Sequence, residues 1–143
     1  MTTSTENHLA RFLDLKTVVD ERGALGVVQN SDLPFDIQRI YFLHDVPPGF
    51  SRGAHGHKRL QQCFVSIGGT VDVTIDDGER RQTFPLSSPS RGLYVPAMRW
   101  RDLTGFSHGA VVLVLASAPY DADDYVHDYE SFRALARAER GRA

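Results

Sequence analysis

Two histidines separated by one residue, His55 and His57, are the most suggestive chemical feature of this 143-residue sequence. An extended strand points residues i and i+2 to the same face, so both imidazoles would lie on one side of the chain. Paired imidazoles can bind a metal ion, and they can also move protons near neutral pH, where an unperturbed histidine titrates. Because His-x-His is a short pattern, the pair alone also fits two solvated loop histidines.

The rest of the chain predicts many short β-strands that could position this pair. Runs rich in β-branched and aromatic residues alternate with turn signals from residue 12 onward, and residues 76–78 form an Asp-Asp-Gly hairpin signal. The apolar run 110–116 is typical of a strand buried on both faces. Eight or more strands without intervening helices favour an all-β fold, an antiparallel barrel or jelly roll.

The length fits one domain, spanning residues 1–143, with a flexible end at residues 1–10. Residues 121–138 differ from the rest, because their apolar side chains recur every three or four positions. Acidic residues come early in this segment and arginines late, which complements a helix dipole. The sequence therefore predicts one C-terminal α-helix packed on the barrel.

Composition and charge exclude several classes of function. Sixteen basic residues against eighteen acidic ones give a formal net charge of −2, which is too balanced for a nucleic-acid partner. No segment reads as a secretory core or reaches the roughly 18 apolar residues of a membrane span, so we expect no membrane association and a cytoplasmic location. The lone Cys63 lies in an apolar run and is interpreted as a packed strand residue.

The stretch 52–62, continued to Gly68, resembles the first signature of the cupin superfamily of small β-barrels. In metal-binding cupins this signature supplies two histidines and a glutamate, and a second signature supplies another histidine. Here Gln61 stands in the glutamate position, and the second region, 92–101, contains no histidine. Two imidazoles and a neutral amide would bind a divalent metal weakly, and Arg101 would repel it. We therefore expect a cupin-type jelly roll without a metal.

A longer resemblance covers roughly residues 12–135 and is to the sugar 3,4-ketoisomerases. It rests on the stretches 20–25, 33–42, 52–58, 76–78, 88–95, 115–117 and 120–125, and on Trp100. The resemblance implies an enzyme that acts on dTDP-4-keto-6-deoxyglucose, with neither a metal nor a cofactor. It also implies a homodimer that exchanges N-terminal strands.

Moving a ketone from C4 to C3 requires removal of the C3 proton, an enediol or enediolate, and delivery of a proton to C4. By resemblance, His55 is the main base and His57 is its proton partner or orienting group. Tyr41 could donate to the sugar oxygens or relay a proton. Arg39 is two residues from Tyr41 on a predicted strand, so both could enter one pocket.

Other side chains are candidates for substrate binding. Arg52 and Lys58 flank the histidines and could hold the diphosphate, since a guanidinium can engage phosphate through two hydrogen bonds. Tyr94 could stack on the thymine or simply pack in its strand. The remaining candidates are Trp100 and Arg101, which would close the pocket, together with Arg22 and Gln62. Trp100 fits a core position equally well.

Three other functions stay open. A cupin-class epimerase acting at C3 and C5 of the same substrate also uses a histidine base and a tyrosine acid, although its wider pattern is not found in this sequence. A metal-dependent cupin such as a dioxygenase is a second alternative. A sugar-binding or regulatory barrel without catalytic activity is the third.

Overall fold

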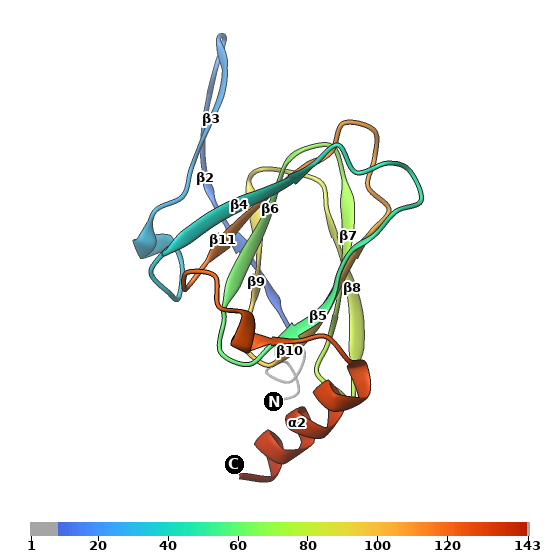
Figure 1. Cartoon of the computed structure of the whole chain (residues 1–143). Helices are drawn as coiled ribbons and strands as arrows, with labels where there is room; N and C mark the ends of the chain where they lie inside the picture. The colour runs from blue at the N-terminus through green and yellow to red at the C-terminus, as the bar shows by residue number, and fades with distance from the viewer. Residues whose placement is uncertain (1–8, 143) are drawn as a thin grey trace.

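Two antiparallel five-stranded sheets face each other and form the body of the molecule (Figure 1). The structure is a computed structural model that describes residues 9–142. In spatial order the first sheet consists of β1 (Arg11–Asp14), β9 (Arg91–Val95), β6 (Gln62–Gly68), β11 (Val111–Ala116) and β4 (Arg39–His44). The second consists of β12 (Tyr125–Val126), β5 (Arg52–His57), β10 (Arg99–Thr104), β7 (Val71–Asp76) and β8 (Arg81–Leu86). The predicted jelly-roll barrel is confirmed.

Five further elements lie outside these sheets. The strands β2 (Lys16–Asp20) and β3 (Gly23–Val27) form a separate hairpin that projects away from the barrel (Figure 1). Two short 3₁₀ helices are η1 (Asn30–Asp32) and η2 (Ala122–Asp124), and the one α-helix within residues 9–142 is α2 (Tyr129–Arg142). No helix within residues 9–142 is both long enough and apolar enough to span a bilayer.

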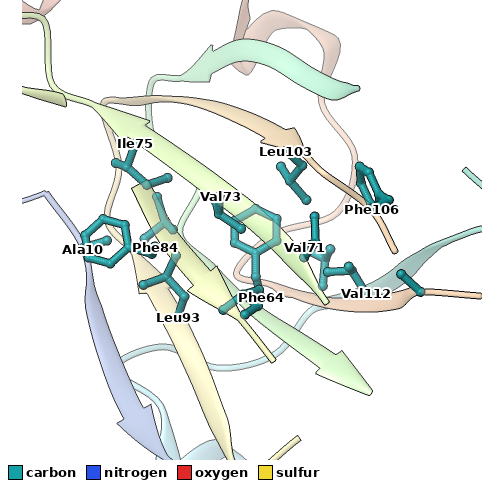
Figure 2. Packing of buried hydrophobic residues seen from close by; sticks show 14 of the residues in the cluster. Ala10, Phe64, Val71, Val73, Ile75, Phe84, Leu93, Leu103, Phe106 and Val112 are labelled. Carbon is teal, nitrogen blue, oxygen red and sulfur yellow. The ribbon is translucent and has the colours of Figure 1, made fainter. Parts of the chain in front are cut away.

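The main core lies between the two sheets (Figure 2). Alternation along β7 points Val71, Val73 and Ile75 inward, and each is at most 2% exposed. They pack with residues of the opposite sheet, such as Leu93 and Val112. Burying an aliphatic side chain of this size contributes about 1.5–3 kcal/mol, so this layer holds the barrel closed.

The outer face of the first sheet carries a second apolar layer. Cys63 and Val65 on β6 point to this face, where Leu33 and Phe35 from the segment after the hairpin cover them. Burial raises the pKa of the Cys63 thiol to about 12, so the thiol stays protonated. The interpretation of Cys63 as a packed strand residue is confirmed.

The C-terminal helix exists, but the predicted span of 121–138 is wrong at both ends. The helix begins at Tyr129, where the Asp128 carboxylate accepts a hydrogen bond from the Ser131 backbone at 2.9 Å, as an N-cap residue does. Before it, residues 122–124 form η2, and residues 125–126 pair with β5 as β12. Spacing alone could not show that this acidic segment is held by the sheet.

The expected flexible end covers residues 1–10. Residues 1–8 lie outside the described part of the chain, so the expectation applies there only as a prediction. Leu9 and Ala10 contradict it, because they are 4% and 2% exposed and belong to the core between the sheets.

Candidate active site

The two histidines lie near the end of β5, which pairs with β10 on one side and β12 on the other. Their ring centroids are 4.9 Å apart and the rings are nearly perpendicular, as residues two apart on one strand can be. The register with β10 shifts between Arg101 and Asp102, which leaves Ala54 as an extra residue with a φ of 59°. Such bulges re-aim neighbouring side chains and occur often beside active sites.

Gly56, between the histidines, lets α2 pack directly against β5. A Cβ atom on Gly56 would lie 2.7 Å from the ring of Phe132, which is too close for any real contact. Phe132 is fully buried against Trp100. The histidine strand is therefore held between the barrel interior and the C-terminal helix.

A cavity of about 530 Å³ opens between β4, β5 and β10, in the size range of small-molecule sites. It is lined by Arg39, Tyr41, Ser51, Arg52, Gly53, His55, Arg101 and Tyr125, with Leu43, Phe64 and Leu103 as its apolar wall. Five of the predicted site residues thus meet in one cavity. They are His55, Tyr41, Arg39, Arg52 and Arg101.

His57 lies behind this cavity and is only 1% exposed. Its Nδ1 is 3.0 Å from Oδ2 of Asp124, whose oxygens also accept from the backbone N–H of Arg59 at 2.7 Å and of Leu60 at 3.2 Å. Because Asp124 accepts from these three donors, we assign the proton of His57 to Nδ1. Its Nε2 is buried and has no hydrogen-bond partner within residues 9–142. His57 and Asp124 border a separate cavity of about 70 Å³.

Both imidazoles are held in the neutral form. Burial lowers the pKa of His55 to about 4, and the nearby Arg101 guanidinium acts in the same direction. Burial, followed by Arg101, lowers the pKa of His57 to about 2. Burial also lowers the pKa of Arg101 to about 10, yet Arg101 still carries its charge at neutral pH. The site therefore combines unprotonated bases with a buried cation.

A hydrogen-bond chain crosses the inner wall of the cavity. Arg101 donates to the Gln62 side-chain oxygen, and the Gln62 amide nitrogen donates to the Tyr41 hydroxyl at 2.8 Å. Burial raises the pKa of Tyr41, so the phenol keeps its proton and can act as a donor. The Arg39 guanidinium lies 4.9 Å from the centre of the Tyr41 ring, within the range of a cation–π contact.

The position expected for a third metal ligand needs a correction. The side chain beside Arg101 is that of Gln62, whereas Gln61 accepts a hydrogen bond from the Tyr94 hydroxyl at 2.6 Å. Residues 9–142 contain no group of three or more His, Cys, Asp or Glu side chains arranged to hold a metal ion. A neutral amide paired with a guanidinium is a poor ligand, so the residues present do not fit a divalent metal.

Four predicted site residues lie elsewhere. Trp100 cannot share the cavity with Arg101, because adjacent strand residues face opposite sides, and it packs on α2 instead. Tyr94 lies in the outer apolar layer, and Lys58 is exposed and does not line the cavity. Arg22 is at the end of the projecting hairpin, where its side chain is 84% exposed and pairs with Asp20 at 2.6 Å.

Sequence reasoning assigned no role to two residues at the centre of this site, Asp124 and Tyr125. The Tyr125 ring lies 4.9 Å from the His55 ring and 4.4 Å from the His57 ring, between centroids. A signal for them was present in the sequence, since both residues belong to the stretch 120–125 that resembles the sugar 3,4-ketoisomerases. Their spacing indicated a helix, and only the pairing of β12 with β5 brings them to the histidines.

The fold and the site together define a class of protein: a cupin-type barrel whose cavity holds a neutral histidine, backed by a second one, beside a tyrosine and a buried arginine. The family described as FdtA, WxcM-like, C-terminal matches residues 8–137. The TDP-4-oxo-6-deoxy-α-D-glucose-3,4-oxoisomerase of Aneurinibacillus thermoaerophilus is 38% identical over 86% of this chain and 89% of its own. The chain therefore belongs to the FdtA family and is an isomerase of the sugar 3,4-ketoisomerase type.

Solved structures agree with this assignment. QdtA, a sugar 3,4-ketoisomerase from Thermoanaerobacterium thermosaccharolyticum determined with TDP, matches with a TM-score of 0.90 and 32% identity over 93% of this chain and 98% of its own. A histidine-to-asparagine variant of QdtA was determined with TDP-4-keto-6-deoxyglucose. The TDP-quinovose 3,4-ketoisomerase WlaRB of Campylobacter jejuni matches with a TM-score of 0.83 and 39% identity over 87% and 97% of the two chains.

Proposed function

We propose that this enzyme converts dTDP-4-keto-6-deoxyglucose to its 3-keto isomer without a metal or a cofactor. The names of its relatives write the same nucleotide group as TDP. The observation that carries the proposal is the position of His55. It is a neutral base that lines a cavity together with a protonated phenol and a buried guanidinium. These are the groups that proton abstraction next to a carbonyl requires.

In the proposed reaction, His55 takes the proton from C3 of the sugar. The electron pair of the broken C3–H bond forms the C3=C4 double bond, and the C4 carbonyl oxygen becomes an oxyanion. Tyr41 donates a hydrogen bond to this oxygen, and the charge of Arg101 stabilises it. The proton of the C3 hydroxyl then passes to the oxygen at C4, so that C3 becomes the new carbonyl and C4 carries the hydroxyl. C4 receives the proton that His55 took from C3, or one from solvent, and His55 returns to its neutral form. Atoms balance, and no electrons are gained or lost.

His57 and Asp124 support the base in this proposal. His57 does not border the large cavity, but its ring contacts that of His55 at a centroid distance of 4.9 Å. With its Nδ1–H held by Asp124, its Nε2 lone pair stays available on the opposite side of the ring. His57 thus orients His55 and acts as its proton partner.

Arg39 and Arg52 are the proposed diphosphate-binding residues. Both line the cavity, and Arg52 is exposed, where a charged ligand can reach it from solvent. Lys58, Tyr94 and Trp100 receive no role in this proposal, because their side chains do not line the cavity.

We also propose a homodimer that exchanges the β2–β3 hairpins. Val18, Val19 and Leu25 on the hairpin are 47%, 71% and 63% exposed, which is unusual for clustered apolar residues. The strand β4 ends its sheet and exposes Ile40 and Phe42, so it offers an unpaired apolar edge to a partner. Arg22 keeps a predicted substrate-binding role only through such a dimer.

A cytoplasmic location also stays a prediction.

The test of function is incubation with dTDP-4-keto-6-deoxyglucose followed by NMR of the product. The proposal expects a 3-keto sugar nucleotide and solvent deuterium at the carbons whose protons move. Deuterium at C5 would instead indicate an epimerase, and substrate binding without exchange would indicate a non-catalytic barrel. Stoichiometric iron, zinc or manganese in the purified, active protein would contradict the metal-free reaction.

A further inference from the structure

Gln62 borders the active site without entering it. Its side chain is fully buried, and it does not line the 530 Å³ cavity. Both ends of its amide are paired: the oxygen accepts from Arg101, and the nitrogen donates to the Tyr41 hydroxyl at 2.8 Å. Gln62 can therefore affect a ligand in the cavity only through one of these two residues.

The direction of both hydrogen bonds follows from the donors and acceptors available. A guanidinium has donors only, so the amide oxygen must face Arg101. The amide nitrogen must then face Tyr41, and the phenol oxygen accepts. A hydroxyl that accepts through its oxygen keeps its hydrogen for another acceptor. Within residues 9–142 the Tyr41 hydroxyl has no second partner, while its side chain lines the cavity.

We propose that Gln62 is a positioning residue that directs the Tyr41 hydroxyl hydrogen toward the substrate. Arg101 fixes the orientation of the amide, and the amide fixes which way Tyr41 donates. The inference rests on the proposed function, in which Tyr41 donates to the oxygen at C4. It replaces the expectation that Gln62 binds the substrate itself.

The substitution Gln62→Glu tests this direction selectively. Glutamate keeps an oxygen toward Arg101, but it replaces the N–H donor with a second acceptor, so Tyr41 would turn its hydrogen away from the substrate. Since removing one oriented donor to an oxyanion costs roughly 100- to 1,000-fold, we expect kcat to fall about 10- to 100-fold, with little change in KM. The comparison is made at about pH 8, where the low pKa of His55 keeps that base neutral in both proteins.

Gln61→Glu is the matched control, because it makes the same chemical change at the neighbouring residue. Gln61 bonds to Tyr94, away from the cavity, so its substitution should leave kcat within about twofold of wild type. An equal loss in both variants would overturn the inference, since it would mean that an added carboxylate at either of these neighbouring positions lowers activity.

A double-mutant cycle separates positioning from other roles. In a Tyr41→Phe background the hydroxyl is gone, so Gln62→Glu should cause no further loss of kcat. Equal losses with and without the hydroxyl would overturn the inference. If Gln62→Glu fails to fold, Gln62→Met removes the same donor and completes the same cycle.

A measurement without turnover keeps the inference independent of the reaction. In ¹⁵N–¹H spectra, Tyr41→Phe should shift the side-chain amide signals of Gln62 and leave those of Gln61 in place. Unchanged Gln62 signals would overturn the inference whatever the activity. Absence of a 3-keto product from the wild-type enzyme would contradict the proposed function instead.

Discussion

The buried Arg101 adds to the effect of burial in keeping both histidines unprotonated. It faces His55 across the β5–β10 pairing and lowers the pKa of both histidines in addition to the effect of burial. The same charge is available to an oxyanion that forms in the cavity. A single cation thus favours an unprotonated base before the reaction and a negative charge during it.

This arrangement predicts how the activity depends on pH. With the pKa of His55 at about 4, kcat/KM should be nearly constant above about pH 5 and should fall as the pH drops through that pKa. Removing the charge with Arg101→Gln raises the pKa of His55 toward its usual value of about 6.5, so the acid limb should move to higher pH.

The control is Arg101→Lys, which keeps a positive charge at the same position. Its acid limb should stay close to that of wild type, even if its kcat is reduced. A pH–rate profile between about pH 3.5 and 8 measures all three proteins. An acid limb of Arg101→Gln that coincides with the wild-type limb would contradict the role of Arg101.

Asp124 predicts a second effect at the scale of single residues. In Asp124→Asn, one acceptor oxygen becomes a donor and must face either the Arg59 backbone N–H or the Leu60 backbone N–H and His57. With the amide nitrogen toward His57, the Nδ1–H form loses its acceptor; with the nitrogen toward Arg59, two donors meet and the side chain must shift away from His57. In either orientation kcat should fall, by about 100-fold if the pair assists proton transfer.

The ¹⁵N shifts of the His57 ring report this tautomer directly. Asp121→Asn is the matched control, because Asp121 flanks the same η2 segment and is exposed. It should leave both the tautomer and kcat unchanged. A wild-type tautomer and wild-type kcat in Asp124→Asn would show that Asp124 only shapes the turn after β5.

At the scale of elements, sequence reasoning succeeded where the signal was local. The Asp-Asp-Gly turn at residues 76–78 joins β7 to β8, as predicted, and His55 and His57 share a face because strand periodicity is strict. It failed for residues 121–126. Their spacing predicted a helix, but they include η2 and the strand β12, which pairs with β5. Hydrogen bonds from residues 57–60 hold that segment, and no local pattern encodes such a distant partner.

The contact between α2 and β5 predicts the cost of changing Gly56. A methyl group in Gly56→Ala would meet the Phe132 ring at 2.7 Å, so α2 or the ring must shift. We expect a loss of about 1–3 kcal/mol in the free energy of unfolding, measured by urea denaturation, and lower activity because the strand of the histidines moves.

Gly68→Ala is the matched control on β6, since its new methyl group would meet only ordinary contacts at 3.8 Å and beyond. It should cost clearly less than Gly56→Ala. Adding Phe132→Leu to Gly56→Ala should recover part of the loss, because the shorter side chain relieves the clash. Equal costs for the two glycines would contradict this account of the helix packing.

At the scale of the whole molecule, the projecting hairpin is the least explained part of a single copy. All residues of β2 and most of β3 are exposed, although the hairpin carries Val18, Val19 and Leu25. The sequence predicted strand-like runs from residue 12 onward, but the local pattern could not show that β2 and β3 leave the barrel. A second copy of the chain would give their apolar side chains a place to pack.

The double variant Val18→Glu/Leu25→Glu tests this interpretation. These two residues pair across the hairpin, so the change places two charges on one of its faces. We expect a dimer for the wild-type protein and a monomer for the variant by sedimentation velocity, with the fold retained. Gln82→Glu, an exposed change on β8 of the second sheet, should stay dimeric. A monomeric wild-type protein would contradict the exchanged dimer.

The central claim is that His55 moves protons on a keto sugar nucleotide. Its most direct test is the reaction of dTDP-4-keto-6-deoxyglucose in D₂O with the wild-type protein, His55→Asn, and His108→Asn, which changes an exposed loop histidine. NMR should show a deuterated 3-keto product with the wild type and with His108→Asn, and neither product nor exchange with a folded His55→Asn. Wild-type turnover by His55→Asn, or no 3-keto product from the wild type, would contradict the account.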